Sequence, residues 1–318
     1  MEKKYLNKYK NTYGKRYTRR QKEKFREAIR NDFDALGYES ELHDANGRFA
    51  RYKNIYVGNR KQAKLTIVVP YDTPSKVVWP KNKFYPQEGL VNMKKSFFPI
   101  YGPLLIGYGF FMLMIYVLPY VSNSPQVQSV IYLLSFVYFV FLLLFVARGF
   151  ANKQNAQRNS ASIALALAFA ASLSKESRKQ VMFIFTDGNR QTKYYGNKEV
   201  KKYREKHKIS IPMLALSCLG KGNILRMIGD KDIHKTITKN LKKTYQGSLA
   251  LQSKTVQDID KGGTCLEHLK NIGLLSSGYM DNDGLYVLHT GTSKDNEIDA
   301  FILNDVKALM LVMLQKLK

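Results

Sequence analysis

The feature that most constrains this chain is a long stretch between Lys95 and Arg148 that carries no charged side chain. It holds two apolar runs, Phe97–Val121 and Val130–Val146, with a short polar turn at Ser122–Gln126 between them. A helix needs about 20 apolar residues to cross a hydrocarbon core of about 30 Å. Soluble core helices rarely run this far without a polar face. The stretch therefore predicts a transmembrane hairpin of two helices.

Basic residues flank this hairpin on both sides, and the turn has none. Lys94 and Lys95 precede it, and Arg148 and Lys153 follow it. The positive-inside rule then places both flanks in the cytoplasm. We expect a multi-pass protein of the cell membrane with both termini cytoplasmic. The expected organisation is a basic N-terminal helix and first strands over residues 1–95, the hairpin over 96–147, and the rest of one interrupted domain over 148–318.

The chain is strongly basic, with a formal net charge of +26. Nucleic acid, an anionic membrane face or an acidic ligand would each explain this charge. With a membrane anchor, the membrane surface is the simplest partner, and no sequence motif points to nucleic acid. The basic N-terminus is interleaved with tyrosines and fits either a surface-binding segment or a solvated helix start. The two isolated cysteines, Cys218 and Cys265, favour a reducing compartment.

Strands alternate with helices over the rest of the chain. Arg19–Leu36 predicts an amphipathic helix, Asn159–Ser174 a buried one, and Leu266–Ile272 and Ile298–Leu317 two more. The predicted strands are Asn54–Val57, Leu65–Val69, Gln180–Thr186, Ile211–Leu219, Ile224–Ile228 and Tyr286–Leu288. This order predicts an α/β three-layer sandwich with a mostly parallel mixed sheet, interrupted by the hairpin.

Five short segments next to these elements carry the functional argument. They are Pro70-Tyr71-Asp72-Thr73, Arg158-Asn159-Ser160-Ala161-Ser162, Asp187-Gly188-Asn189-Arg190, Leu216-Ser217-Cys218-Leu219-Gly220 and Tyr286-Val287-Leu288-His289-Thr290. In their order, these segments resemble the motifs of the co-catalytic zinc aminopeptidases, metallopeptidase family twenty-eight. The resemblance runs from Asn54 to the C-terminus outside the hairpin.

The resemblance implies that the catalytic metal site is degenerate. Four ligand positions are changed: a His to Pro70, the bridging Asp to Arg158, a Glu to Arg190 and an Asp to Ser217. The general-base Glu is Asn189, and only the last ligand, His289, is kept. Zinc takes His, Cys, Asp or Glu and needs about three of them at a catalytic site. We therefore expect no bound metal, no catalytic residue and no cofactor, with zinc present only if the protein is an active hydrolase.

The changed positions also predict an anion site. Arg158, Arg190 and His289, with Asp72 beside them, would edge the old cleft and hold a peptide carboxylate or another anion. Asp72 and Asp187 are the nearest candidates to neutralise the two arginines. The run Cys265-Leu266-Glu267-His268 gathers three metal-ligand types, but on a short helix a mixture of core and surface positions is the favoured explanation.

Three functions stay open at this point. The first is a membrane-tethered, non-catalytic domain that binds a peptide, an anionic ligand or a membrane-protein partner. The second is an active membrane-bound aminopeptidase with an atypical metal set, drawing on Asp187, Asp72, His289, Asp281 and Asp283. The third is a sensor of anionic lipid or phosphate at the inner leaflet.

Overall fold

The computed structural model describes residues 2–46, 51–77, 81–121, 124–148, 150–152, 154–188, 194–233 and 245–317. The main helices are α1 (Glu2–Asn7), α2 (Arg19–Asp34), α3 (Gly89–Tyr116), α4 (Pro125–Arg148), α5 (Ala161–Ser172), α7 (Tyr195–Lys206) and α10 (Ala300–Lys316). The strands are β1 (Ser40–Asn46), β2 (Arg51–Val57), β3 (Leu65–Pro70), β4 (Lys83–Phe84), β5 (Val181–Thr186), β6 (Met213–Leu216), β7 (Ile224–Gly229), β8 (Ala250–Thr255), β9 (Ile272–Asp281) and β10 (Gly284–Leu288).

The strands form one mixed sheet in the order β1-β2-β5-β3-β6-β9-β10-β4, with β7 on β9 and β8 on β7. The centre is parallel, because β5, β3, β6 and β9 run side by side in one direction. The outer pairings of β1, β2, β4 and β10 are antiparallel, and so is the pairing of β7 with β9. The predicted mixed α/β sheet is confirmed. Its parallel pairings are those of the centre and that of β7 with β8, so "mostly parallel" does not hold for the sheet as a whole.

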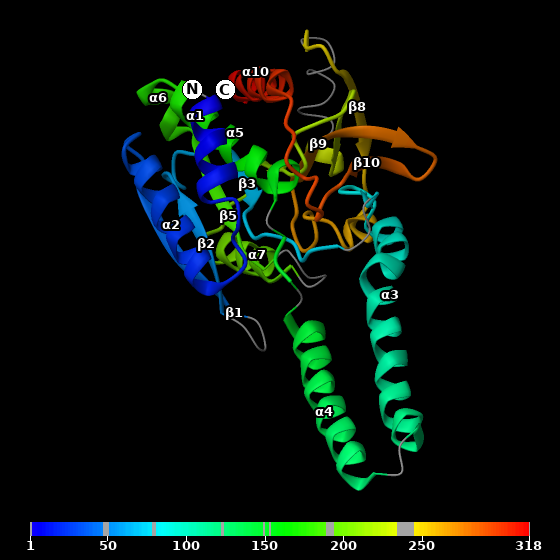
Figure 1. Cartoon of the computed structure of the whole chain (residues 1–318). Helices are drawn as coiled ribbons and strands as arrows, with labels where there is room; N and C mark the ends of the chain where they lie inside the picture. Colours follow the sequence, from blue (N-terminus) through cyan, green and yellow to red (C-terminus); the bar gives the residue numbers. More distant parts are fainter. Residues whose placement is uncertain are drawn as a thin grey trace.

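Two hydrophobic cores lie on opposite faces of the sheet (Figure 1). Alternate residues of each central strand point to opposite faces, so Ile67 and Val69 join one core and Val68 joins the other. The larger core is covered by α2, α5 and α10 and the smaller by α7. α5 is apolar on all sides because both the sheet and other helices cover it. This is the three-layer arrangement that the element order predicts.

Helices α3 and α4 project from the domain as an antiparallel pair, joined at their far end (Figure 1). The prediction of two membrane-spanning helices is wrong in one respect. Among the described residues, only Pro125–Leu144 of α4 is long and apolar enough to cross a membrane by length and composition. The uninterrupted apolar part of α3, Tyr101–Tyr116, is shorter. The α-helix ends there because Pro119, which cannot donate a backbone hydrogen bond, lies in the 3₁₀ turn Leu118–Val121 that follows.

Two further expectations change with the structure. The stretch predicted as a helix over Leu266–Ile272 is a series of turns that leads into β9. The basic N-terminus is part of the larger core, since α1 and the π-turn Lys8–Thr12 after it bury Tyr5 and Tyr9 against α5. The segment is therefore not merely a solvated helix start, and surface binding by its solvent-facing lysines stays a prediction.

Candidate functional site

The carboxyl ends of three parallel strands meet at one edge of the sheet. β3 ends at Pro70, opposite Thr186 of β5, and β6 ends one residue before Ser217. The chain segment Ala156–Ser160, which leads into α5, lies against the same edge. In open α/β sheets this edge is where ligands bind. Tertiary structure thus brings together segments that lie far apart in the sequence.

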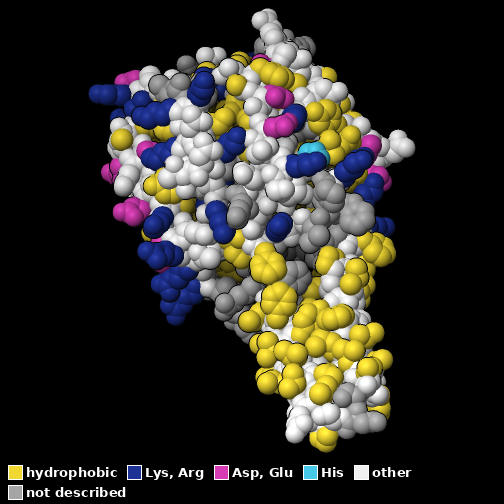
Figure 2. All heavy atoms as spheres, viewed as in Figure 1, with side chains coloured by type: hydrophobic (Ala, Val, Ile, Leu, Met, Phe, Trp, Pro, Cys, Tyr) yellow, Lys and Arg dark blue, Asp and Glu magenta, His cyan; other side chains and the backbone are white. Residues whose placement is uncertain are grey.

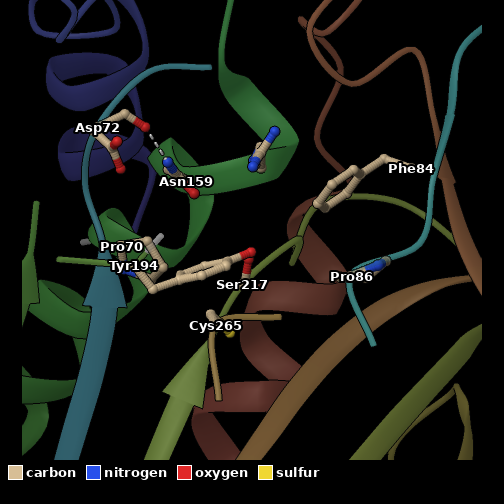
Figure 3. A pocket seen from close by; sticks show the side chains of 9 residues that line it. Pro70, Asp72, Phe84, Pro86, Asn159, Tyr194, Ser217 and Cys265 are labelled. Carbon is tan, nitrogen blue, oxygen red and sulfur yellow. Dashed lines mark hydrogen bonds between the residues drawn. The ribbon is translucent and has the colours of Figure 1, made fainter. Parts of the chain in front are cut away.

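A small cleft opens at this edge (Figure 3). Its volume is about 20 Å³ among the described residues, room for little more than one water-sized group. Four of the predicted site residues line it, namely Pro70, Asp72, Arg158 and Ser217. The other described lining residues are Phe84, Pro86, Asn159, Tyr194 and Cys265. The convergence that the motif order predicts is therefore seen for these four positions.

The other predicted site residues, Asn189, Arg190 and His289, are not among the described lining residues of the cleft. Asn189 and Arg190 lie outside the described residues. His289 does not line the cleft and is half-buried in the loop after β10, where its backbone N–H donates to the Asn82 carbonyl at 2.8 Å. Its backbone is left-handed, with φ at 65°. The expectation that His289 edges the cleft is not met by the described lining.

Arg158 is the positive group of the cleft. Its guanidinium lies over the ring of Phe84, 4.3 Å from the centroid, a cation–π contact. No carboxylate of the described chain comes within ion-pair distance of it. Asp72 is buried, and its backbone carbonyl accepts from the Asn159 side chain. Arg158 therefore keeps its charge without a described salt bridge.

Asp187 does not pair with Arg158, while its predicted pairing with Arg190 lies outside the described residues. Its carboxylate is buried and pairs with Lys22, which reaches in from α2. It also accepts the backbone N–H of Gly188 at 2.8 Å and of Lys53 at 3.4 Å. Asp187 thus fixes α2 to the end of β5, and its negative charge neutralises Lys22 and not Arg158. The sequence conceals this contact, because Lys22 reads as an exposed residue of a basic amphipathic helix.

Several lining residues escape sequence reasoning. Phe84 and Pro86 follow a Lys- and Pro-rich loop that has no motif, and Tyr194 precedes a helix that was not predicted. Cys265 belongs to the run of three potential ligands, which is the one signal that pointed near the cleft. Tyr194 has a left-handed backbone and donates its hydroxyl to the Gly263 carbonyl at 2.8 Å. This hydrogen bond fixes the phenol as one wall of the cleft.

The loop after β10 contacts the segment Ala156–Ser160, next to the cleft, through Asp295. This carboxyl is fully buried, and Oδ1 accepts the backbone N–H of Gln157 at 2.8 Å. Oδ2 has no hydrogen-bond partner among the described residues. Burial raises the pKa of Asp295 to about 6, although the neighbouring Arg158 acts in the opposite direction. Protonation of Asp295 is therefore easier in the folded protein than in the unfolded chain.

We expect Asp295→Asn to stabilise the protein at pH 7. The folded-state pKa of Asp295 lies above its ordinary value of 3.8, so its contribution to stability is present below about pH 4 and is lost as the pH rises through about 6. Two pKa units correspond to at most about 3 kcal/mol at pH 7, or some 6 to 12 °C in Tm at about 2 to 4 °C per kcal/mol. Asn keeps the acceptor for Gln157.

The measurement is Tm of the full chain in detergent at pH 4 to 8. The variant should also flatten the pH dependence between about pH 4 and 6. Glu39→Gln, at an exposed carboxyl, is the control and should change little. A loss of stability in Asp295→Asn at pH 7 would mean that the ionised carboxylate has a cationic partner.

Comparison with known proteins places the fold. No family model matches the sequence, and no curated protein matches it either. Solved structures do match. A Zn-dependent exopeptidase from Parabacteroides distasonis has a TM-score of 0.60 at 9% identity, over 98% of this chain and 94% of that one. This chain has an aminopeptidase-like fold.

Two further structures agree. The glutaminyl cyclase of Tannerella forsythia has a TM-score of 0.60 at 9% identity, over 98% of this chain and 96% of that one. A leucine aminopeptidase precursor from Bacteroides thetaiotaomicron has a TM-score of 0.57 at 11% identity, over 98% of this chain and 93% of that one. At such low identity the likeness concerns the fold alone. The aminopeptidase-like fold confirms the coarse prediction drawn from the five motifs.

The expectation that the protein needs no cofactor is overturned by these comparisons, because an enzyme with this fold is Zn-dependent. The described residues support no particular cofactor in its place. No group of three or more His, Cys, Asp or Glu side chains within the described ranges is arranged to hold a metal ion. In the cleft, Asp72 and Cys265 are the only side chains of a zinc-ligand type among the described lining residues, beside Pro70, Arg158 and Ser217, and a zinc site needs about three. This donor set does not fit a zinc site of the usual kind.

Proposed function

We propose that this protein is a membrane-anchored, aminopeptidase-like domain that binds the carboxylate of a ligand at Arg158 without hydrolysing it. The observation that carries the proposal is the position of Arg158. It lies in a cleft at the carboxyl ends of the parallel strands, stacked on Phe84, with no described carboxylate in ion-pair distance. At this place the resemblance would put a metal-bridging carboxylate.

The chemistry of the cleft favours a small anionic group. A guanidinium keeps its charge at neutral pH and presents a planar fork that suits a carboxylate. The cleft has room for little more than a water-sized group among the described residues, so a carboxylate head enters more readily than a side chain. A terminal carboxylate of a peptide or a small organic acid is the ligand class that meets both conditions.

The residues around the cleft favour binding over hydrolysis. Hydrolysis at such a site needs a base that takes a proton from water. The sequence has Asn189 where the resemblance expects the general base. The buried carboxylate two residues before it, that of Asp187, pairs with Lys22 and accepts two backbone N–H groups. It is therefore a structural anchor and does not replace the base.

The helix pair supports a membrane anchor. Only 6% of Pro125–Leu144 is buried, whereas the core helix of a soluble protein would be mostly buried. Figure 2 shows hydrophobic side chains over much of the surface of the projecting pair. The 20 residues of this segment extend about 30 Å as a helix, which matches the hydrocarbon core. Because both helices join the domain at the same end, the domain stays on one side, and the basic flank Lys94–Lys95 makes that side cytoplasmic.

Carboxylate binding is tested by Tm of the full chain in detergent. We expect sodium acetate to raise Tm relative to sodium chloride at equal ionic strength, and Arg158→Ala to abolish that rise. Arg20→Ala, which removes an exposed arginine elsewhere, is the matched control and should behave like wild type. An equal response to acetate in Arg158→Ala would contradict binding at this position.

The same preparation tests the absence of hydrolysis. Leucine p-nitroanilide and a peptide with N-terminal glutamine are offered with added zinc, and turnover at the level of buffer is expected. Zinc-dependent turnover that is lost in His289→Ala would replace this proposal with an active hydrolase.

Topology is tested with a single cysteine at Gln126, at the tip of the pair, in a Cys218→Ser/Cys265→Ser background. A membrane-impermeant maleimide should label this cysteine in intact cells. A cysteine at Lys3 should be labelled only after the membrane is opened. Extraction of the protein by alkaline carbonate, or labelling of Lys3→Cys from outside, would rule out the proposed anchor.

A further inference from the structure

A second and much larger cavity lies where the helix pair meets the domain. Its volume is about 500 Å³. One side is apolar and comes from α3 and α4, with Pro103, Gly107, Tyr138, Phe141 and Leu142. The other side belongs to three loops of the domain and carries Lys76, Val77, Phe150, Thr292, Ser293 and Lys294. The cavity therefore has an apolar half and a cationic, hydroxyl-bearing half.

The domain side of this cavity is held together by backbone contacts. Ser75 and Ala151 form an isolated β-bridge. The Lys76 N–H donates to the Phe150 carbonyl at 2.6 Å, and the Val77 N–H donates to the Gly291 carbonyl at 2.8 Å. The Asn152 side chain donates to the Thr292 carbonyl at 2.9 Å. These contacts join the three loops into one wall of the cavity.

The helix side is shaped by Gly107. A Cβ atom at this position would lie 3.0 Å from Leu142 Cδ2 and 3.2 Å from the Tyr138 hydroxyl oxygen. That hydroxyl donates to the Gly107 carbonyl at 3.2 Å. The contact satisfies a polar group beside apolar side chains and holds α3 close to α4. The seam between the helices forms an apolar floor below the two lysines.

Lys76 and Lys294 supply the charge. Both side chains are exposed, and neither is in an ion pair with any described residue. The hydroxyls of Thr292 and Ser293 lie in the same lining. An unpaired cationic pair above an apolar seam complements a ligand with an anionic head and a hydrocarbon tail. Because the anchoring proposed above puts this junction at the level of the lipid head groups, such a ligand is at hand in the bilayer.

We infer that this junction cavity is a binding site for an anionic phospholipid. Its phosphate lies between Lys76 and Lys294, and one acyl chain lies along the seam of α3 and α4. The inference rests on the membrane anchoring proposed above and is independent of the absence of peptidase activity. The site is separate from the Arg158 cleft, with which it shares no described lining residue.

The test is native mass spectrometry of the full chain in detergent, titrated with phosphatidylglycerol or with phosphatidylcholine of the same acyl chains. We expect wild type to retain one phosphatidylglycerol in preference to phosphatidylcholine. The double variant Lys76→Gln/Lys294→Gln should weaken phosphatidylglycerol binding by about 30-fold, since each lysine near an anionic head group contributes about fivefold. Ser293→Trp, at an exposed lining position, should weaken it by filling the cavity.

The matched control is Lys24→Gln/Lys206→Gln, which makes the same charge change at exposed lysines elsewhere and should leave binding unchanged. Equal retention of both lipids, or a double variant that binds like wild type, would overturn the inference. Competition by inorganic phosphate as effective as that by the lipid would overturn it too, because the acyl chain would then contribute nothing. Carbonate extraction separates the two proposals, since the double variant should stay in the membrane if the anchor is correct.

Discussion

Replacing Arg16 with Ala should lower the Tm of the protein by about 10 °C. Arg16 is fully buried, although it lies in a basic N-terminal segment. Its guanidinium donates to the carbonyls of Tyr71 and Tyr13, to the Tyr9 carbonyl at 3.2 Å and to Ser160 Oγ at 3.1 Å. It thus ties the N-terminal segment to the end of β3 and to the start of α5. Burial lowers the pKa of Arg16 to about 9, which leaves it protonated at neutral pH.

The size of this effect follows from the partners that the variant would leave behind. Loss of a buried, fully hydrogen-bonded charge costs about 3 to 5 kcal/mol, and for a chain of this size about 1 kcal/mol corresponds to some 2 to 4 °C. Arg16→Lys keeps the charge but loses the fork geometry, so its Tm should fall between those of wild type and Arg16→Ala.

Arg19→Ala is the control for this experiment. Arg19 is exposed, and its one ion pair among the described residues is with Glu23, one turn further along α2. The Tm of Arg19→Ala should therefore stay within about 2 °C of that of wild type. Thermal unfolding of full-length variants in one detergent gives the comparison. If Arg16→Ala unfolds like Arg19→Ala, the N-terminal segment is not part of the core.

Both cysteines should react with iodoacetamide about a thousandfold more slowly in the folded protein than in the unfolded chain. Burial raises the pKa of Cys218 and of Cys265 to about 12, from an ordinary value near 9. The thiolate is the reactive form, so at pH 8 this shift removes nearly all of it. Arg158 acts in the opposite direction on both thiols but does not outweigh burial.

Single variants Cys218→Ser and Cys265→Ser assign the rates, and the same proteins in guanidinium chloride give the unfolded reference. The two thiols are expected to differ in what protects them. Cys218 is enclosed in the core, whereas Cys265 lines the Arg158 cleft. Rapid labelling of Cys265 alone in the folded protein would show that the cleft opens in solution.

The amino-acid sequence by itself determined the elements whose pattern is local. The runs that became β3 and β5 are β-branched and aromatic, and the apolar run that became α5 suits a helix covered on all sides. Their order predicts a mixed α/β sheet. The resemblance of the motifs predicts a shared site, and among the described residues the cleft brings together Pro70, Asp72, Arg158 and Ser217. Strand ends in a parallel sheet meet wherever the strands are neighbours, so motif order carries spatial information.

The tertiary structure decided what depends on partners distant in sequence. Lys22 and Arg16 look like solvent-facing charges in a basic segment, and only folding shows that buried acceptors surround them. β9 was read as part of a helix and a loop, because its burial depends on β6 and β7 on either side. Hydropathy likewise indicates how apolar α3 is, but where its α-helix ends depends on the turn at Pro119. Periodicity reports which face of an element is apolar, whereas the identity of the group facing a buried charge is set by chain segments that no local pattern connects.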